Sequence, residues 1–243
     1  MIPKIIHYCW FGGNPLPQSA IKCINSWRKY LPDYEIKEWN EDNFDVNIIP
    51  YSKEAYEAKK YAFVSDYARF WVLYRYGGLY FDTDVEVIRP MDEIIQRGPF
   101  MGVEAGAAGA VAPGLGLGAT PHLDLYKELL DYYNDLHYCN QDGQWDGMTS
   151  VTHTTKVLSR NGLQMTDDLQ EIAGIWIYPA DYFCPMDHTT GITTITPRTV
   201  SIHHYDASWR DHRSWHYVLH VMKNFVFRLL GSKLAHYINN VLH

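Results

Sequence analysis

The sequence predicts an α/β fold, because strand and helix patterns alternate from the first residues onward. Lys4–Phe11 is a β-branched and aromatic run closed by Gly12–Pro15, a pattern typical of a buried strand followed by a loop. In Pro17–Leu31 the apolar residues recur at helical spacing, and Tyr34–Trp39 again has the composition of a strand. A strand, a helix and a second strand in this order favour an α/β domain over a bundle or a sandwich.

The next segment predicts helical structure that leads directly into a buried strand. Lys53–Tyr76 has a helical pattern, which we expect to be divided into two pieces. Gly77 and Gly78 suit a left-handed helix end, because glycine adopts positive φ without a steric penalty from Cβ. Leu79–Phe81 then has the composition of a strand in the protein interior.

The second half of the chain is less regular. Helices are predicted over Tyr126–Tyr138 and Val151–Asn161, and late strands over Ile175–Tyr178 and Ile192–Ile202. Gly102–Gly118 is rich in Gly and Ala and allows two interpretations. It is either a flexible surface loop, or a loop or strand edge at which a ligand approaches the backbone closely.

The length of the chain and its charge distribution predict one large domain followed by a distinct C-terminal tail. The 243 residues are 47% hydrophobic, which suffices for one large core over residues 1–211. The formal charge of −7 argues against general nucleic-acid binding. Residues 212–243 contain four basic residues and no acidic one, and their apolar side chains form a broad helical stripe. This basic amphipathic tail is expected either to pack on its own domain or to contact an anionic membrane surface.

The cysteines and the N-terminus indicate a cytoplasmic location. The four cysteines show no CxxC pair and no spacing typical of a disulfide scaffold, as expected in a reducing compartment. The first 13 residues resemble neither a signal peptide nor a membrane anchor. We therefore expect a cytoplasmic protein, soluble or peripheral at the inner face of the cytoplasmic membrane.

Two carboxylates interrupt the buried run that starts at Gly77. If the chain stays extended, the side chains of Asp82 and Asp84 point the same way and lie about 6–7 Å apart. Their like charges repel, and at the carboxyl end of a strand in an α/β sheet a divalent cation would relieve this repulsion. Oxygen ligands of this kind favour Mg²⁺ or Mn²⁺, ions that commonly also hold substrate phosphates.

A DXD pattern alone has other interpretations. A calcium-binding EF-hand loop is excluded because Val87 stands where that loop requires glycine. A glycoside hydrolase that uses Asp82 and Asp84 as acid and base remains open. A sugar-binding module that binds metal without performing chemistry also remains open.

A second polar pair precedes the aspartates. Asp66 and Arg69 are three residues apart, so they are neighbours on one face of the predicted helix. They form either a structural ion pair or a polar site for sugar hydroxyls and anionic oxygens.

The segment that contains both pairs reads SDYARFWVLYRYGGLYFDTD, and it resembles the DXD signature of glycosyltransferase family 32. That family includes bacterial capsular polysaccharide enzymes and fungal initiating mannosyltransferases, and the clostridial toxin glucosyltransferase domains are more distantly similar. Three further segments resemble family elements in the family's order: IPKIIHYCWFGG, IYPADYFCP and SIHHYDASW. The resemblance extends from Ile2 to Trp209.

The resemblance implies a GT-A-type, Rossmann-like mixed sheet flanked by helices, with the tail as a C-terminal helical appendage. It implies a retaining transferase that moves a hexose from a nucleotide-sugar to a saccharide or lipid-linked oligosaccharide acceptor. A UDP-sugar is the favoured donor, GDP-mannose is the alternative, and Mn²⁺ or Mg²⁺ is the expected cofactor. Capsular polysaccharide, exopolysaccharide or lipopolysaccharide assembly is the implied pathway.

The resemblance also implies roles for individual residues of this chain. Asp66 and Arg69 match donor-sugar contacts, and Asp84 matches the direct metal ligand. Asp82 matches the carboxylate beside the ribose and the metal, and Tyr80 matches a tyrosine beside the nucleotide.

Four further matches lie near the two ends of the resemblance. Trp10 matches the aromatic side chain that stacks on the nucleobase. Ser208 and Trp209 match a clamp on the diphosphate. His204 is the preferred late metal ligand, with His203 as the alternative. No covalent nucleophile stands out, so a front-face mechanism is expected, with Glu104 as the remaining nucleophile candidate.

Overall fold

The computed structural model describes residues 1–106, 109–140, 145, 147–187 and 192–206. The strands are β1 (Ile5–Cys9), β2 (Glu35–Trp39), β3 (Gly78–Tyr80), β4 (Val85–Val87), β5 (Phe100–Gly102), β6 (Leu117–Ala119), β7 (Gln170–Ile172), β8 (Ile175–Tyr178) and β9 (Ser201–His203). The helices are α1 (Gln18–Tyr30), α2 (Pro50–Glu57), α3 (Tyr61–Tyr76), α4 (Asp92–Arg97), α5 (Asp124–Asn134), α6 (Ser150–Arg160) and α7 (Ala180–Phe183). The predicted α/β fold is confirmed.

A seven-stranded mixed sheet forms the centre of the described part, in the order β2-β1-β3-β6-β5-β8-β7. β1 runs parallel to both β2 and β3, and β5 runs parallel to β8. β6 is antiparallel to β3 and β5, and β7 is antiparallel to β8. A separate two-stranded antiparallel sheet pairs β4 with β9. The carboxyl ends of β1 and β3 therefore lie side by side, where ligands bind in α/β sheets.

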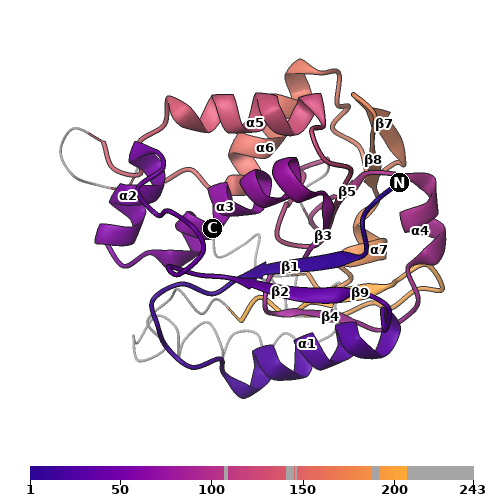
Figure 1. Cartoon of the computed structure of the whole chain (residues 1–243). Coiled ribbons are helices and arrows are strands. Elements are labelled where there is room, and N and C mark those ends of the chain that lie inside the picture. Colours follow the sequence, from indigo (N-terminus) through magenta and orange to yellow (C-terminus); the bar gives the residue numbers. More distant parts are fainter. Residues whose placement is uncertain (107–108, 141–144, 146, 188–191, 207–243) are drawn as a thin grey trace, which may run out of the picture.

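Helices cover both faces of the sheet (Figure 1). α1 lies on one face with the β4-β9 sheet, and α2, α3, α5 and α6 lie on the other. Each face has its own hydrophobic core, and β3 contributes to both because its side chains alternate. Leu79 and Phe81 are buried in the core beside α1, whereas Tyr80 is buried in the core beside α3. Phe81, the residue before Asp82, therefore fixes the chain in the core beside α1.

Gly77 and Gly78 connect α3 to β3 and need to be glycine. Their φ angles are 63° and 98°, so the positive φ expected from the sequence is confirmed, although a ψ of −160° places Gly77 outside the left-handed helical conformation. A Cβ atom on Gly78 would also lie 2.6 Å from the carbonyl oxygen of Ile5. The side chain of His7 fills the adjacent space, where its Nε2 lies 2.9 Å from the carbonyl oxygen of Gly77. This close approach holds the end of α3 against β1.

The Gly- and Ala-rich segment is mostly buried rather than a surface loop, and of its described residues only Gly106 is exposed. Gly102 ends β5, residues 111–118 are buried, and β6 lies in the middle of the sheet. A Cβ atom on Gly102 would lie 2.7 Å from the ring of Phe183, and one on Gly118 would overlap the ring of Phe100. Small residues are needed because aromatic rings from neighbouring elements occupy the space above them.

Several boundaries differ from the sequence-based expectation. The strand expected over 192–202 forms only at Ser201–His203, because a turn at Pro197 and Arg198 interrupts it. α5 ends at Asn134 rather than Tyr138, since Glu54 binds the following backbone N–H groups of Tyr138 and Cys139. The helix expected over 53–76 is divided into α2 and α3, as predicted.

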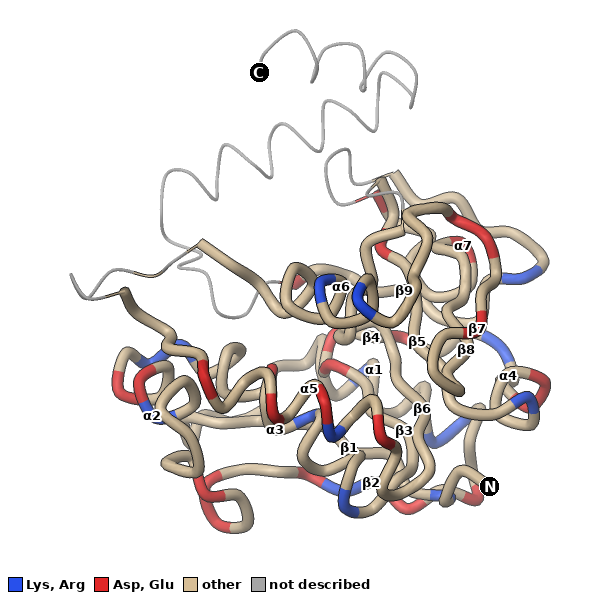
Figure 2. The backbone as a smooth tube through the Cα atoms, turned by 90° about the horizontal axis from the view of Figure 1, so that it is seen from above, with Lys and Arg blue, Asp and Glu red and all other residues tan. Residues whose placement is uncertain are grey.

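Acidic and basic residues both occur within α2, α4 and α5 (Figure 2). No helix among the described residues is long and apolar enough to cross a membrane. The tail predicted at 212–243 lies outside the described residues, so the proposed division at residue 211 stays a prediction.

Candidate functional site

The two aspartates of the DXD pattern lie in a turn between β3 and β4. β3 ends at Tyr80, and the N–H of Val85 donates to the carbonyl oxygen of Asp82 at 3.0 Å. The expectation of an extended strand through both aspartates was wrong, because the chain leaves the central sheet after Tyr80 and joins β9 instead. The turn nevertheless brings the carboxylates of Asp82 and Asp84 toward the same space.

Asp84 is bound on both carboxylate oxygens by the segment that ends β9. Nε2 of His203 lies 3.1 Å from Oδ1, and the N–H of Asp206 donates to Oδ2 at 3.0 Å. The N–H of His204 also donates to the backbone carbonyl of Asp84 at 3.0 Å. The pairing of β4 with β9 sets this arrangement, because Val85 lies opposite His203.

These contacts shift the ionisation of both partners. Burial alone would raise the pKa of Asp84, but the charge and the hydrogen bond of His203 outweigh it and lower that pKa. Burial would likewise lower the pKa of His203, but Asp84 outweighs it and raises that pKa. The pair therefore favours a carboxylate beside an imidazolium in the absence of another cation.

Asp82 is held by groups from three different elements. The hydroxyl of Tyr80 donates to its Oδ1 at 3.0 Å, and Nη2 of Arg69 lies 3.0 Å from the same oxygen. The other oxygen faces Gly114, where any Cβ atom would overlap the carboxylate. Burial raises the pKa of Asp82, and the charge of Arg69 opposes this rise.

Arg69 connects Asp82 to α3 and α6. Its Nη1 lies 2.9 Å from Oδ1 of Asp66 and 3.5 Å from Oγ of Ser150, the first residue of α6. The Arg69 side chain is only 4% exposed; its pair with Asp66 is buried, and its pair with Asp82 is partly buried. Burial raises the pKa of Asp66 to about 6, although Arg69 opposes the shift. The predicted helix-face pair is thus also part of the DXD site.

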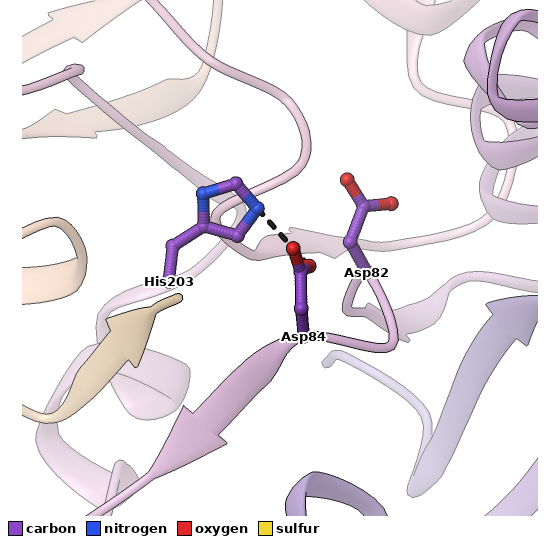
Figure 3. A group of neighbouring side chains, drawn as sticks. All are labelled: Asp82, Asp84 and His203. Atoms are coloured by element: carbon purple, nitrogen blue, oxygen red, sulfur yellow. Dashed lines mark ion pairs between the residues drawn. The ribbon is translucent and has the colours of Figure 1, made fainter. Parts of the chain in front are cut away.

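Asp82, Asp84 and His203 could together hold a divalent cation (Figure 3). One ligand atom from each residue lies within 4.8 Å of the others, and both carboxylates point into the space beside the imidazole. Two carboxylates suit Mg²⁺ or Mn²⁺, and one imidazole completes a set of three protein ligands with room for substrate oxygens. The donor set therefore fits the cofactor that the sequence predicts.

The position of His204 corrects the preferred choice of third ligand. His203 faces Asp84, whereas Nε2 of His204 lies 2.8 Å from Oε2 of Glu86, and Lys22 binds the same oxygen at 3.1 Å. Successive residues point to opposite sides at the end of a strand, so only one histidine of the pair can face the aspartates. His203, the alternative in the sequence analysis, is the residue in place.

Of the three remaining residues expected at the site, the structure describes only Trp10. Trp10 directly follows β1, next to the end of β3, and its Nε1 donates to the carbonyl oxygen of Asn14 at 2.6 Å. Its indole is partly exposed at the same edge of the sheet as the DXD turn. Ser208 and Trp209, the expected diphosphate clamp, lie outside the described residues.

Sequence reasoning missed three residues that border this site, namely Gly114, Ser150 and Tyr205. Gly114 and Ser150 come close to Asp82 and Arg69 from segments more than 30 residues downstream. Tyr205 packs its ring on His203 with the ring centres 4.2 Å apart, and its hydroxyl donates to Glu104 at 3.1 Å. Only Gly114 had a signal in the sequence. It lies in the Gly- and Ala-rich segment, for which one of the two interpretations was close approach of a ligand to the backbone.

The fold and the acidic turn together resemble those of DXD-containing glycosyltransferases. Residues 17–101 match the family described as "Glycosyltransferase sugar-binding region containing DXD motif". The resemblance predicted from the sequence is thereby confirmed over this region, which contains Asp66, Arg69, Tyr80, Asp82 and Asp84.

Curated relatives show the same similarity. The chain is 33% identical over 98 residues to inositol phosphoceramide mannosyltransferase 3 of Schizosaccharomyces pombe, covering 39% of this chain and 27% of that protein. It is 28% identical over 105 residues to mannosyl phosphorylinositol ceramide synthase CSH1 of Saccharomyces cerevisiae, covering 42% of this chain and 28% of that protein. The match thus spans little more than a quarter of the length of these relatives.

Solved structures support the GT-A-type fold. PaToxG glycosyltransferase superposes with a TM-score of 0.50 and 21% identity, covering 65% of this chain and 69% of that chain. A glycosyltransferase involved in glycosylation of the major capsid of PBCV-1 superposes with a TM-score of 0.50 and 12% identity, covering 85% and 95%. The predicted mixed sheet flanked by helices is confirmed, and these two structures share that fold.

Proposed function

We propose that the protein is a retaining, metal-dependent glycosyltransferase that moves a hexose from a nucleotide-sugar to a saccharide acceptor. One observation carries the proposal: Asp82, Asp84, His203 and the buried Arg69 converge where the parallel strands β1 and β3 end. This edge is where α/β sheets bind nucleotides, and the four side chains offer a cation site beside a fixed positive charge.

The side chains divide the work of holding the donor. A divalent ion bound by Asp82, Asp84 and His203 would neutralise the diphosphate and stabilise the leaving oxygen. Arg69 is fixed by Asp66 and Asp82 before any ligand arrives, so its orientation costs nothing at the moment of reaction. Its Nε is buried and has no hydrogen-bond partner among the described residues.

The mechanism proposed is attack by the acceptor hydroxyl on the face that the diphosphate leaves, with the departing phosphate taking the proton. Glu104, the remaining nucleophile candidate, accepts a hydrogen bond from Tyr205. A carboxylate occupied in this way is less available to attack an anomeric carbon. This supports the front-face mechanism and leaves retention as the expected stereochemistry.

The donor is proposed to be a UDP-sugar, with GDP-mannose as the alternative. The resemblance to polysaccharide enzymes favours the first, and the names of the yeast relatives, which are mannosyltransferases, favour the second. The acceptor proposed is a saccharide or a lipid-linked oligosaccharide in capsular polysaccharide, exopolysaccharide or lipopolysaccharide assembly.

The location proposed is the cytoplasm, with residues 212–243 contacting the anionic inner face of the membrane. Their basic amphipathic composition supports this contact. Deleting residues 212–243 should reduce recovery of the protein with vesicles that contain anionic lipid. Undiminished recovery would remove the tail from the proposal without affecting the donor site.

A glycoside hydrolase is the second candidate, and one observation favours it. The pKa of Asp82 is raised mainly by burial, whereas that of Asp84 is lowered because His203 outweighs burial. Carboxyl groups whose pKa values are pushed apart are typical of acid and base pairs. A hydrolase of this kind would require neither a metal nor a nucleotide.

A thermal-shift panel separates these candidates. The full chain is heated with UDP, GDP and their sugars, each with and without Mn²⁺, because selective binding to the native state raises its melting temperature. We expect a shift that requires both Mn²⁺ and one of the two nucleotides. No shift with any combination, from a protein shown to be folded, would overturn the transferase proposal.

A matched pair of variants links the shift to the site. Asp84→Asn removes the charge that faces His203, whereas Glu86→Gln changes a carboxylate two residues away that binds Lys22 and His204 instead. We expect Asp84→Asn to abolish the metal-dependent shift and the metal-dependent hydrolysis of the donor, and Glu86→Gln to keep both. Equal behaviour of the two variants would contradict the assignment of Asp84.

A further inference from the structure

The segment His203–Asp206 wraps around Asp84 and contacts it three times. The imidazole of His203 and the N–H of Asp206 each bind one carboxylate oxygen, and the N–H of His204 binds the backbone carbonyl. Three consecutive contacts to one residue require the backbone to bend sharply between His204 and Asp206.

Tyr205 provides this bend in an unusual conformation. Its φ angle is 52°, in the left-handed region that glycine prefers and that a bulky side chain rarely adopts. Such a conformation persists only where surrounding contacts hold it, and it is found preferentially at functional sites. The side chain of Tyr205 must therefore be well anchored.

The anchor consists of two polar groups and one ring contact. The hydroxyl of Tyr205 donates to Oε1 of Glu104 at 3.1 Å and lies 3.0 Å from Sγ of Cys184. The ring lies against the imidazole of His203, with the ring planes 70° apart. The buried Cys184 also accepts from the N–H of Ala105 at 3.5 Å, so its sulfur joins the segment after β5 to the end of α7.

We propose that Glu104 and Tyr205 are positioning residues for the cation site: Glu104 holds the Tyr205 hydroxyl, and Tyr205 orients His203 and the N–H of Asp206 toward Asp84. This inference rests on the proposed function, because it concerns the cation site of that same transferase. Groups that orient metal ligands commonly influence affinity about 10- to 100-fold when they are removed.

The role assigned to Glu104 depends on its oxygen and not on its charge. Glutamine keeps an oxygen that accepts the hydrogen bond from Tyr205, whereas alanine removes it. A nucleophile or a metal ligand would instead require the carboxylate, so Glu104→Gln would then be as damaging as Glu104→Ala. The two substitutions therefore distinguish positioning from chemistry.

The experiment is a titration of the full chain with Mn²⁺ alone, followed by electron paramagnetic resonance of the free ion. We expect Tyr205→Phe and Glu104→Ala to weaken Mn²⁺ binding about tenfold. We expect Glu104→Gln to stay within about twofold of the wild type, because its hydrogen bond to Tyr205 is kept. Tyr182→Phe is the matched control, because it removes one hydroxyl from neighbouring α7, where the Tyr182 ring lies against Tyr178 and Arg198, and it should bind like the wild type.

The outcomes separate the inference from the proposed function. Unchanged Mn²⁺ affinity in a folded Tyr205→Phe, or equal losses in Glu104→Gln and Glu104→Ala, would overturn the positioning role. Absence of Mn²⁺ binding to the wild type would also overturn it. Failure of the transferase proposal would differ, because the wild type and variants would then show the expected Mn²⁺ affinities without hydrolysing any nucleotide-sugar.

Discussion

The guanidinium of Arg69 lies 3.0 Å from the carboxylate of Asp82, although the first residue belongs to α3 and the second to the turn after β3. Asp66 binds the other end of the same guanidinium at 2.9 Å. The Arg69 side chain is almost completely buried, so salt screens its pairs with Asp66 and the partly exposed Asp82 less than it screens pairs at the surface. The helix and the DXD turn are thereby fixed relative to one another before a ligand binds.

Replacing Arg69 by methionine should destabilise the fold strongly. The buried carboxylate of Asp66 and the partly buried carboxylate of Asp82 would lose their cation, and breaking a buried pair in this way costs about 3–5 kcal/mol. The free energy of unfolding, measured by urea denaturation at pH 7.5, should fall by this amount. Arg198→Met is the control, because Arg198 is 58% exposed in its pair with Asp181 and its loss should cost below about 1 kcal/mol. Similar losses in both variants would contradict the buried triad.

Stability should depend on pH through the buried His7. Nε1 of Trp39 donates to its Nδ1 at 3.0 Å, and its Nε2 faces the carbonyl of Gly77, so the folded state requires the neutral ring. Burial lowers the pKa of His7 from 6.5 to about 4. The unfolded chain therefore binds more protons between pH 6.5 and 4, and stability falls as the pH falls, by about 3 kcal/mol at most.

Asp66 acts in the opposite direction over nearly the same range. Burial raises its pKa to about 6, so the folded state keeps the proton to a higher pH, and this group stabilises the fold as the pH falls. Comparison with His7→Gln isolates the histidine, since the amide retains both a donor and an acceptor. The free energy of unfolding is measured by urea denaturation at pH 7.5 and 4.5. On acidification it should fall less, or rise more, in His7→Gln than in the wild type. Parallel pH dependence of the two proteins would contradict a neutral buried His7.

Gly114 should be required for the position of Asp82. A Cβ atom at residue 114 would overlap the Asp82 carboxylate, which Arg69 and Tyr80 hold in place. Gly114→Ala should weaken Mn²⁺-dependent nucleotide binding about tenfold or more, the equivalent of one charge-assisted hydrogen bond. Isothermal titration in the presence of Mn²⁺ measures this change.

Gly118→Ala on the same segment provides the contrast. Its Cβ atom would meet the ring of Phe100 in the hydrophobic core, so it should reduce stability by about 1–3 kcal/mol through overpacking. The folded fraction should still bind nucleotide like the wild type. If Gly114→Ala bound normally and Gly118→Ala did not, the assignment of the two glycines would be wrong.

Local patterns were sufficient to predict the elements that lead to the site. β1, α1, β2, α3 and β3 have strong apolar periodicity or clear glycine boundaries, and all five lie close to their expected positions. The pair Asp66 and Arg69 followed from helical spacing alone, because residues three apart on a helix are neighbours.

Other features depend on contacts between distant segments. β4, β5, β6 and β7 have three residues each, too few to show a period, and they exist because neighbouring strands complete their hydrogen bonds. The choice between His203 and His204 depends on how β9 pairs with β4, and a shift of one residue would exchange the two side chains. A sequence alone does not contain this register.

The two histidines should consequently respond differently to the same substitution. His203→Ala removes the imidazole that lies 3.1 Å from Asp84, and with it one of the three atoms that could hold a cation. His204→Ala instead removes a partner of Glu86, which keeps its contact with Lys22. We expect the first variant to weaken Mn²⁺ binding at least tenfold, because losing a ligand should cost no less than losing a group that only orients one, which costs about 10–100-fold.

The His204 variant should bind Mn²⁺ like the wild type and lose less than about 1 kcal/mol of stability, as partly exposed ion pairs do. Titration with Mn²⁺ and urea denaturation of both variants give the two readouts from the same preparations. Weak Mn²⁺ binding by His204→Ala together with normal binding by His203→Ala would mean that β9 adopts the other register, and the cation site would have to be rebuilt around His204. Since each backbone N–H to Asp84 remains in both variants, a difference between them reports on the imidazoles alone.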